Sequence, residues 1–282
     1  TLGYDFVNND NDSSDDNGHG TEVAYIAKTI APGAEIISVK VIDADGNGYE
    51  SLVLEGIQYC IDQNVDVISL SIGAGISEGF CDSNIVSDLV NTAVAKGIFV
   101  SSATGNDGST NLRVPSCASN ATRVSSTTKT DEITDFANVN KFVDVFSPGE
   151  GINTKTIGGI SNSISGTSAS APMIAAGAVL VLENESLNPE ELKYRLRSTG
   201  LPILYAINSS YDINISRLDV YNAVLNNTTM IPYDYTGNQT NVTIENYSLL
   251  APTVTLLSPI DNYSFGNTSS INYANGSPYA GG

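Results

Sequence analysis

The first two thirds of the chain alternate between two spacings of apolar side chains. Apolar residues recur at the interval of one helix face in three stretches, residues 19–30, 51–63 and 84–96. Short runs of apolar and β-branched residues follow them, at residues 35–41, 65–70 and 97–102. Helix and strand in alternation predict an α/β fold, with a mainly parallel β-sheet flanked by helices on both faces.

The expected sheet also indicates where a site would lie. In parallel sheets covered by helices, ligands bind beyond the carboxyl ends of the strands. Residues 71–73 directly follow one expected strand, and residues 104–108 follow the next. We therefore expect functional side chains in these two segments.

The last third of the chain has a different composition. Residues 188–197 have a proline in the first turn and basic residues near the end, as helices prefer. Beyond them Asn, Thr and Tyr become frequent, so we expect a first domain over residues 1–226 and a linker over residues 227–250. Residues 251–282 are bounded by proline and rich in β-forming residues. They resemble the opening of an immunoglobulin-like β-sandwich, and a disordered tail is the alternative.

The chain is strongly acidic, with 31 Asp and Glu against 12 Lys and Arg and a formal charge of −19. Nucleic acid and anionic lipid surfaces would repel it, so no nucleic-acid partner is expected. No apolar run reaches the roughly 18 to 20 residues that cross a bilayer, and the richest run, residues 173–182, fits a buried helix. The chain begins at Thr1 without a basic and apolar leader, so we expect that any signal peptide or propeptide was removed or not included.

Three scattered cysteines and one histidine exclude a zinc site and a histidine cluster. Cys60 lies in an apolar helical stretch and is expected in the core. Cys81 and Cys117 lie in polar loop sequence. They either form a disulfide, which would need an oxidising compartment, or remain reduced.

The end of the chain is dense in Asn-X-Ser/Thr sequences. N-glycosylation of an exported protein explains them, and chance in an Asn-rich, Thr-rich sequence is the alternative. The asparagines are Asn208, Asn214, Asn226, Asn227, Asn238, Asn241, Asn246, Asn262, Asn267 and Asn275.

His19 is the only histidine of the chain, so any histidine-dependent proton transfer must use it. It has a glycine on each side, and a helix is expected to begin beside it. Flanking glycines allow a tight turn that leaves the imidazole accessible, as a general base requires.

Residues 165–172 (SGTSASAP) form a turn of small residues that runs into the apolar helix. Ser168 would stand near the N-terminus of this helix, where backbone N–H groups and the helix dipole favour developing negative charge. The segment resembles the active-serine motif of the subtilisin-like serine protease family (the subtilases), Gly-Thr-Ser-x-Ala-x-Pro. Four positions match it, namely Gly166, Thr167, Ser168 and Pro172. The resemblance implies that Ser168 is the nucleophile and His19 the general base.

Two further segments extend the resemblance. Residues 101–108 (SSATGNDG) resemble the family's oxyanion segment, which implies that the side-chain amide of Asn106 donates to the tetrahedral oxyanion. A simple turn is the alternative for this segment. Residues 67–75 (VISLSIGAG) resemble the strand edge at which an extended peptide pairs. The implied substrate-binding residues are Ser71, Ile72, Gly73, Ala103, Thr104 and Gly105.

The family's triad also includes an aspartate at the end of a first strand, tens of residues before the histidine. No such strand or motif precedes His19, and we expect this aspartate upstream of the fragment, not replaced by Asp5. The fragment alone is then expected to be nearly inactive, because loss of that carboxylate costs a subtilase about 3 × 10⁴ in turnover. The motif around His19 also departs from the family at Glu22 and Tyr25, where His and Gly are usual.

The acidic run before His19 resembles the calcium loop of some subtilases. Alternating Asp and Asn side chains and backbone carbonyls could supply the oxygen ligands that calcium prefers, and Asp10 and Asp12 are the candidate ligands. A solvated charged loop is the alternative. No cofactor is expected for the chemistry itself.

The resemblance implies an exported, extracellular or cell-surface serine endopeptidase that cleaves polypeptides through an acyl-enzyme at Ser168. A lipase or esterase is disfavoured, because no Gly-x-Ser-x-Gly surrounds Ser168. The alternative is a non-catalytic subtilase-like surface module that binds a partner. Retention of Ser168, His19 and Asn106 argues against it, since an inactive copy has no chemical reason to keep all three.

Overall fold

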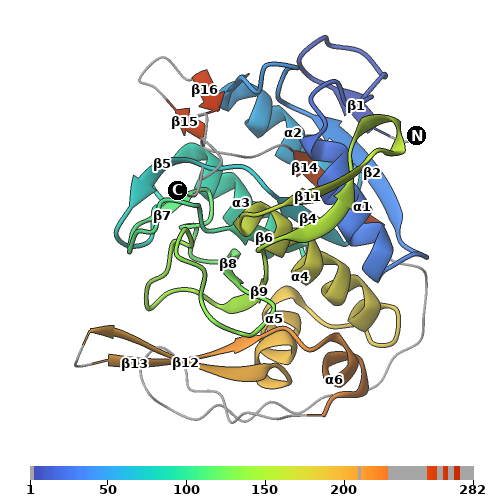
Figure 1. Cartoon of the computed structure of the whole chain (residues 1–282). Helices are drawn as coiled ribbons and strands as arrows, with labels where there is room; N and C mark the ends of the chain where they lie inside the picture. The colour runs from blue at the N-terminus through green and yellow to red at the C-terminus, as the bar shows by residue number, and fades with distance from the viewer. Residues whose placement is uncertain (1–2, 209–210, 228–252, 259–262, 266–269, 274–282) are drawn as a thin grey trace.

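A computed structural model describes residues 3–208, 211–227, 253–258, 263–265 and 270–273. Within these residues, a nine-stranded sheet dominates the molecule (Figure 1). The strands are parallel to their neighbours, except that β12 is antiparallel to β13. The order across the sheet is β1 (Gly3–Asp5), β2 (Glu35–Lys40), β14 (Thr253–Ser258), β4 (Val67–Leu70), β6 (Phe99–Ala103), β8 (Thr122–Thr127), β9 (Val145–Pro148), β13 (Tyr211–Arg217) and β12 (Leu201–Asn208).

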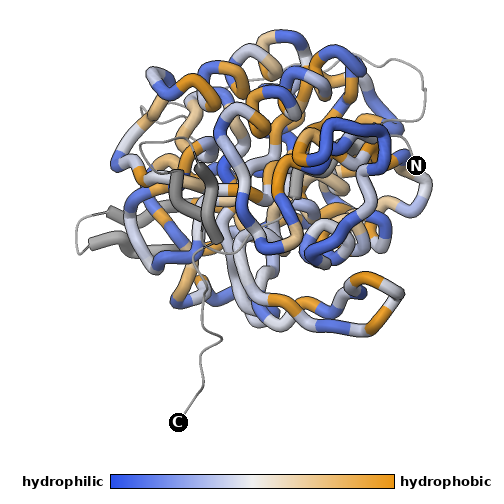
Figure 2. Tube along the Cα trace, turned by 90° about the horizontal axis from the view of Figure 1, so that it is seen from above, coloured by the Kyte–Doolittle hydropathy of each residue, from blue (hydrophilic) through white to orange (hydrophobic). Residues whose placement is uncertain are grey.

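Helices pack on this sheet in two groups. On one side, α4 (Thr167–Leu182) crosses β4, β6, β8 and β9 and packs against α1 (His19–Ile30). On the other, α2 (Glu50–Asp62) packs against α3 (Ile85–Ala95), and α3 against β6. Figure 2 shows hydrophobic positions along the strands and on the helices that flank them. The predicted α/β architecture is therefore confirmed.

Two helices begin at a residue whose side chain caps the helix N-terminus. Asn84 caps α3, its side-chain oxygen accepting hydrogen bonds from Val86 N and Ser87 N. Asn188 and Glu191 form a capping box at the start of α5 (Pro189–Ser198). The helices predicted at residues 19–30, 51–63, 84–96 and 188–197 agree with the observed bounds to within one residue. The apolar helix predicted from residues 173–182 begins six residues earlier, at Thr167, so most of the predicted turn of small residues is helical.

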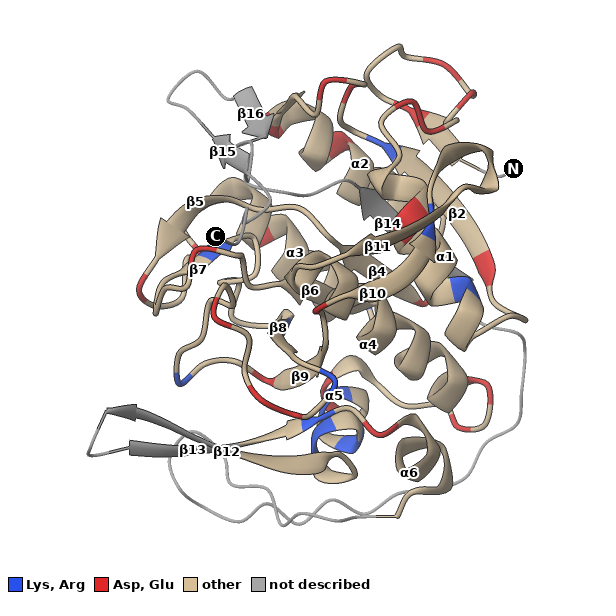
Figure 3. Cartoon of the chain, in the orientation of Figure 1, with Lys and Arg blue, Asp and Glu red and all other residues tan. Residues whose placement is uncertain are grey.

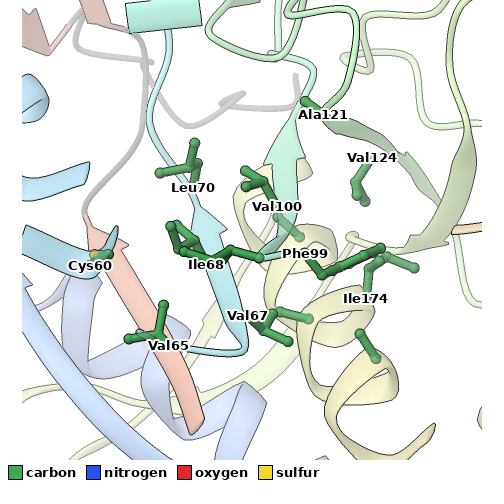
Figure 4. Close-up of a cluster of buried hydrophobic side chains, with 14 of the residues drawn as sticks. Cys60, Val65, Val67, Ile68, Leu70, Phe99, Val100, Ala121, Val124 and Ile174 are labelled. Atoms are coloured by element: carbon green, nitrogen blue, oxygen red, sulfur yellow. The ribbon is translucent and has the colours of Figure 1, made fainter. Parts of the chain in front are cut away.

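The core lies where β4, β6 and β8 meet α4 (Figure 4). Every residue of β4 is buried, as expected for a parallel strand covered on both faces. Ile174 of α4 lies beside Phe99 of β6, and both are almost fully buried. Cys60 is completely buried in α2, which confirms the prediction for this residue.

Smaller elements surround the sheet. β5 (Ala74–Ser77) pairs antiparallel with β7 (Leu112–Val114), and β10 (Ile152–Lys155) pairs with β11 (Ser161–Ile164) in a hairpin that packs on α1. The remaining elements are β3 (Gly48–Tyr49), the 3₁₀ turn η1 (Ile157–Gly159), α6 (Val220–Leu225), β15 (Tyr263–Phe265) and β16 (Ser270–Tyr273).

The segment predicted to start a β-domain contributes β14, β15 and β16. β14 lies in the large sheet between β2 and β4, and β16 pairs with β3. The linker beyond Asn227 lies outside the described residues, and the domain boundaries remain predictions. Among the described residues, no helix combines the length and apolar character that a membrane span needs.

Candidate active site

His19 is the first residue of α1, and the preceding turn is fixed by Gly18 and Asp15. Gly18 has φ +113°, and a Cβ at this position would lie 2.5 Å from Thr156 Oγ1. The carboxylate of Asp15 accepts hydrogen bonds from Gly18 N (2.9 Å) and Thr21 N (2.7 Å). Asp15 therefore supplies the helix N-terminus with the acceptor that Gly18 lacks.

The imidazole of His19 is removed from water, the residue being 8% exposed. Burial lowers its pKa from 6.5 to about 3, and the nearby Asp15 carboxylate opposes this shift. Burial also raises the pKa of Asp15, but hydrogen bonds from Gly18, Thr21 and Asn17 bring it below its ordinary value. His19 is thus neutral and Asp15 ionised at neutral pH, the forms that a proton acceptor and a helix-capping anion need.

Ser168 is the second residue of α4 and is buried. In a regular helix, its carbonyl would accept the N–H of residue 172, but Pro172 has none. The hydroxyl of Ser71 donates to this carbonyl instead, at 2.9 Å. One residue of the predicted substrate edge therefore supports the backbone of the predicted nucleophile.

Asn106 is tied to the same helix N-terminus through Thr167. Its Oδ1 accepts hydrogen bonds from Thr167 N (2.8 Å) and Thr167 Oγ1 (3.0 Å). In turn, Gly105 N donates to Thr167 Oγ1 at 3.1 Å. With the oxygen end of the amide held in this way, the orientation of its Nδ2 donor end is fixed relative to Ser168.

The two predicted substrate segments leave the sheet side by side. β4 and β6 are neighbours in register, with Leu70 opposite Ser102. Residues 71–73 follow β4 directly, while Ala103 ends β6 and precedes Thr104 and Gly105. The structure thus brings both segments, Asn106 and the start of α4 to the carboxyl edge of the sheet.

One residue next to these segments, Arg113, was missed from the sequence. Arg113, in the middle of β7, contacts both Gly73 and Gly105, and its guanidinium pairs with Asp107. No local pattern indicates this, because the contact requires β7 to return to β5 and to the end of β6. In the sequence, Arg113 is a single arginine in loop-like sequence, and nothing near it indicates a contact with Gly73 or Gly105.

The loop between β1 and α1 is rich in acidic residues, drawn red in Figure 3. Asp10 Oδ1 accepts from Asp12 N at 2.8 Å, and Asp12 Oδ1 accepts from the hydroxyl of Ser14 at 2.5 Å. Asp5 and Asp16 both pair with Lys40, at 3.0 and 2.5 Å. In the part of the chain that the structure describes, no group of three or more His, Cys, Asp or Glu side chains is placed to hold a metal ion.

Cys81 and Cys117 form a disulfide, the pairing that the sequence left open. It joins the ends of the segments that carry β5 and β7. Cys81 N also donates to Cys117 O at 3.1 Å.

Comparison with known proteins identifies the family to which the chain belongs. The model of the subtilase family matches residues 3–248. The chain belongs to the subtilase family. The resemblance stated from the sequence is thereby confirmed.

Individual relatives are similar over the same region. A thermophilic serine proteinase of Bacillus sp. (strain AK1) is 33% identical over 232 residues, which are 79% of this chain and 56% of the relative. A cell wall-associated protease of Bacillus subtilis (strain 168) is 33% identical over 71% of this chain and 23% of its own length. The crystal structure of a cold-adapted subtilisin-like serine proteinase superposes with a TM-score of 0.68 at 32% identity, covering 77% of this subtilase and 80% of that chain. This chain thus spans a little over half the length of the thermophilic serine proteinase and about a quarter of the length of the cell wall-associated protease.

Proposed function

We propose that this subtilase is the catalytic part of a serine endopeptidase that cleaves extended polypeptides. The observation that carries the proposal is the joint anchoring of Ser168 and Asn106. The Ser168 carbonyl is held by Ser71, and the Asn106 amide is held by Thr167, the residue that precedes Ser168. Such fixed geometry is what stabilisation of a transition state requires.

In the proposed reaction, Ser168 Oγ attacks the carbonyl carbon of the scissile peptide bond and His19 takes its proton. The oxyanion that forms accepts hydrogen bonds from Asn106 Nδ2 and from Ser168 N at the start of α4. His19 then protonates the leaving amine, and water releases the acyl group from Ser168 by the same steps in reverse. Burial keeps the imidazole of His19 neutral at neutral pH, the form that accepts a proton, but the same burial makes the imidazole a weaker base.

The peptide itself is proposed to pair with residues 71–73 as an added strand. Residues 103–105 would then form the opposite wall of the pocket for the side chain that precedes the cut. The adjacency of β4 and β6 supports this arrangement, because their carboxyl ends emerge next to each other.

We propose export to the extracellular space or cell surface. The Cys81–Cys117 disulfide supports it, since such bonds persist in oxidising compartments, and one relative is a cell wall-associated protease. Asn226 and Asn227 are exposed at the end of α6, where N-glycans would be tolerated. Structural calcium at Asp10 and Asp12 remains a prediction. The two carboxylates are engaged in hydrogen bonds within the loop, and no step of the reaction depends on a metal.

Hydrolysis of a denatured protein substrate by the full-length protein tests the proposal. Ser168→Ala should lower turnover by about 10⁶-fold, the loss measured when a subtilase lacks its serine. Ser165→Ala is the matched control, because Ser165 is exposed in the same turn and should leave turnover within a few-fold. A serine-directed phosphonate should label Ser168 stoichiometrically. Absence of both turnover and labelling in folded protein would instead favour the binding module.

A further inference from the structure

Arg113 lies between the two segments proposed to bind the substrate. A Cβ added to Gly73 would lie 3.0 Å from Arg113 Cβ and 3.5 Å from its Cγ. A Cβ added to Gly105 would lie 2.5 Å from Arg113 Cγ. Both glycines therefore present their open side to the same side chain, and its aliphatic stem fills the space between them.

The backbone holds this side chain in place. Arg113 N donates to Thr104 O at 3.0 Å, so β7 lies against the segment that follows β6. On its other edge β7 pairs with β5, which continues from residue 73. β7 thus bridges the two proposed substrate segments, and the side chain of its central residue, Arg113, lies between the two glycines.

The guanidinium group is held as firmly as the stem. Arg113 Nε and Nη2 donate to the two carboxylate oxygens of Asp107, at 2.8 and 2.5 Å. Asn138 Nδ2 donates to Asp107 Oδ2 at 2.9 Å, and Asn138 Oδ1 accepts from Asp107 N at 2.8 Å. Burial raises the pKa of Asp107, but these bonds and the charge of Arg113 bring it below its ordinary value. The pair is ionised, bidentate and braced by a third side chain.

We propose that Arg113 determines cleavage specificity by limiting the residue before the cut to small uncharged side chains, such as Gly, Ala or Ser. The inference rests on the proposed function, because it assigns a role to the pocket between residues 71–73 and 103–105. An aromatic or long aliphatic side chain would need the volume that the Arg113 stem occupies. Moving the stem would separate an ion pair that is only partly exposed to water, with side-chain exposures of 15% and 28%.

The charge of Arg113 does not favour an acidic substrate residue. Asp107 accepts from Nε and Nη2 of Arg113 and is held there by Asn138, so its negative charge offsets the charge of the guanidinium next to an incoming carboxylate. The chain as a whole carries a formal charge of −19, which repels acidic peptides. Exclusion of large side chains is therefore a stronger effect on the proposed specificity than attraction of acidic side chains.

The test uses full-length protein and peptide p-nitroanilides that differ only in the residue before the cleaved bond, Ala, Phe or Glu. The wild-type protein should cleave after Ala with the highest kcat/KM. Arg113→Ala should raise the Phe/Ala ratio of kcat/KM by about 100-fold, the range of effect that a few methylene groups have in an apolar pocket. Asp107→Asn keeps the stem but frees the cation, so it should raise the Glu/Ala ratio by about 10-fold and leave Phe excluded.

Arg217→Ala is the matched control. Arg217 also forms a bidentate pair, with Asp131 at 2.7 and 3.2 Å, but it lies on β13 at the far end of the sheet and should leave all ratios unchanged. Wild-type cleavage after Phe at the rate for Ala, or an unchanged ratio in Arg113→Ala, would overturn the inference. Wild-type preference for Glu that disappears in Arg113→Ala would replace it with an acid-binding pocket. If the wild-type protein neither cleaves any substrate nor reacts with the phosphonate, the proposed function itself fails.

Discussion

Ser168 and His19 each stand at the start of a helix, yet the two helix starts are held in different ways. Around Ser168, side chains from β6 and from the segments that follow β4 and β6 contact α4. Ser71 and Ser101 donate to its carbonyls, and Asn106 accepts from Thr167. Around His19, the main support is the carboxylate of Asp15, from the same loop. The serine side is built by the sheet, whereas the histidine side depends on local loop chemistry and on burial.

This difference has a consequence for proton transfer. Burial alone pushes the pKa of His19 far below its usual range, and Asp15 is the charged group that opposes it. A carboxylate hydrogen-bonded to the ring would raise that pKa toward neutrality and make the imidazole a stronger base. Because a lower pKa makes a weaker base, the histidine side is the part of the candidate site whose electrostatics least favour proton transfer.

The titration of His19 measures directly how far burial lowers its pKa. Because the folded pKa is about 3 and the unfolded one about 6.5, the unfolded chain binds a proton first as the pH falls. Stability should therefore be full above pH 6.5 and decline below it by about 1.4 kcal/mol per pH unit, until the folded state also titrates near pH 3. Since the chain has one histidine, its imidazole proton resonance can be followed by NMR without assignment.

The denatured chain is the control for this titration and should titrate near 6.5. His19→Gln should remove the decline in stability between pH 6.5 and 5. A folded-state pKa of 6.5 or higher in this chain would show that the two sides of the site do not differ in this way.

The proposed oxyanion donor on the serine side, Asn106, should have the next greatest effect on turnover. Asn106→Ala should lower kcat by about 10² to 10³ with KM nearly constant, because the donor acts on charge that exists only in the transition state. Asn106→Asp keeps an oxygen for Thr167 and should show at least the same loss. Stoichiometric phosphonate labelling would show that each variant still presents Ser168.

The matched control comes from the histidine side. Asn162→Ala also removes an asparagine amide, whose Nδ2 donates to Glu22 Oε1 at 2.5 Å. It should leave kcat within a few-fold of the wild-type value. Equal losses in the Asn106 and Asn162 variants would mean that Asn106 acts through structure and not on the oxyanion.

Much of this fold could be predicted from the sequence because its signals are local. The strand within residues 65–70 is mostly apolar and β-branched, and α3 is preceded by its capping asparagine, Asn84. The motif residues around Ser168 were also recognisable, since they are contiguous. These features depend on neighbours within a few positions.

The features that were not predicted depend on residues far apart in the chain. Arg113 meets Gly73 and Gly105 only after β7 has folded back between β5 and β6. The placement of β14 between β2 and β4 joins segments about 200 residues apart, and a short β-rich run carries no information about its partners. Long-range strand pairing, and not local propensity, determines the position of Arg113 and that of β14.

The Ser71 hydroxyl is a long-range support whose loss should be measurable. Because Pro172 offers no N–H, Ser71→Ala would leave the buried Ser168 carbonyl without its donor. We expect a loss of about 1–3 kcal/mol in the free energy of unfolding, measured in denaturant, together with a lower kcat. A variant as stable and active as the wild type would show that the start of α4 does not need this support.

Thr154→Val is the corresponding change on the histidine side. Thr154 Oγ1 donates to Glu22 O at 2.8 Å and is buried, much as Ser71 donates to Ser168 O. The Glu22 carbonyl, however, keeps its helical donor, Ile26 N, so removing the hydroxyl leaves no orphaned acceptor. The expected loss is about 1 kcal/mol or less in denaturant unfolding, with kcat unchanged. A loss as great as that of Ser71→Ala would mean that the hairpin β10–β11 supports α1 as firmly as the sheet supports α4, and the distinction between the two sides would no longer hold.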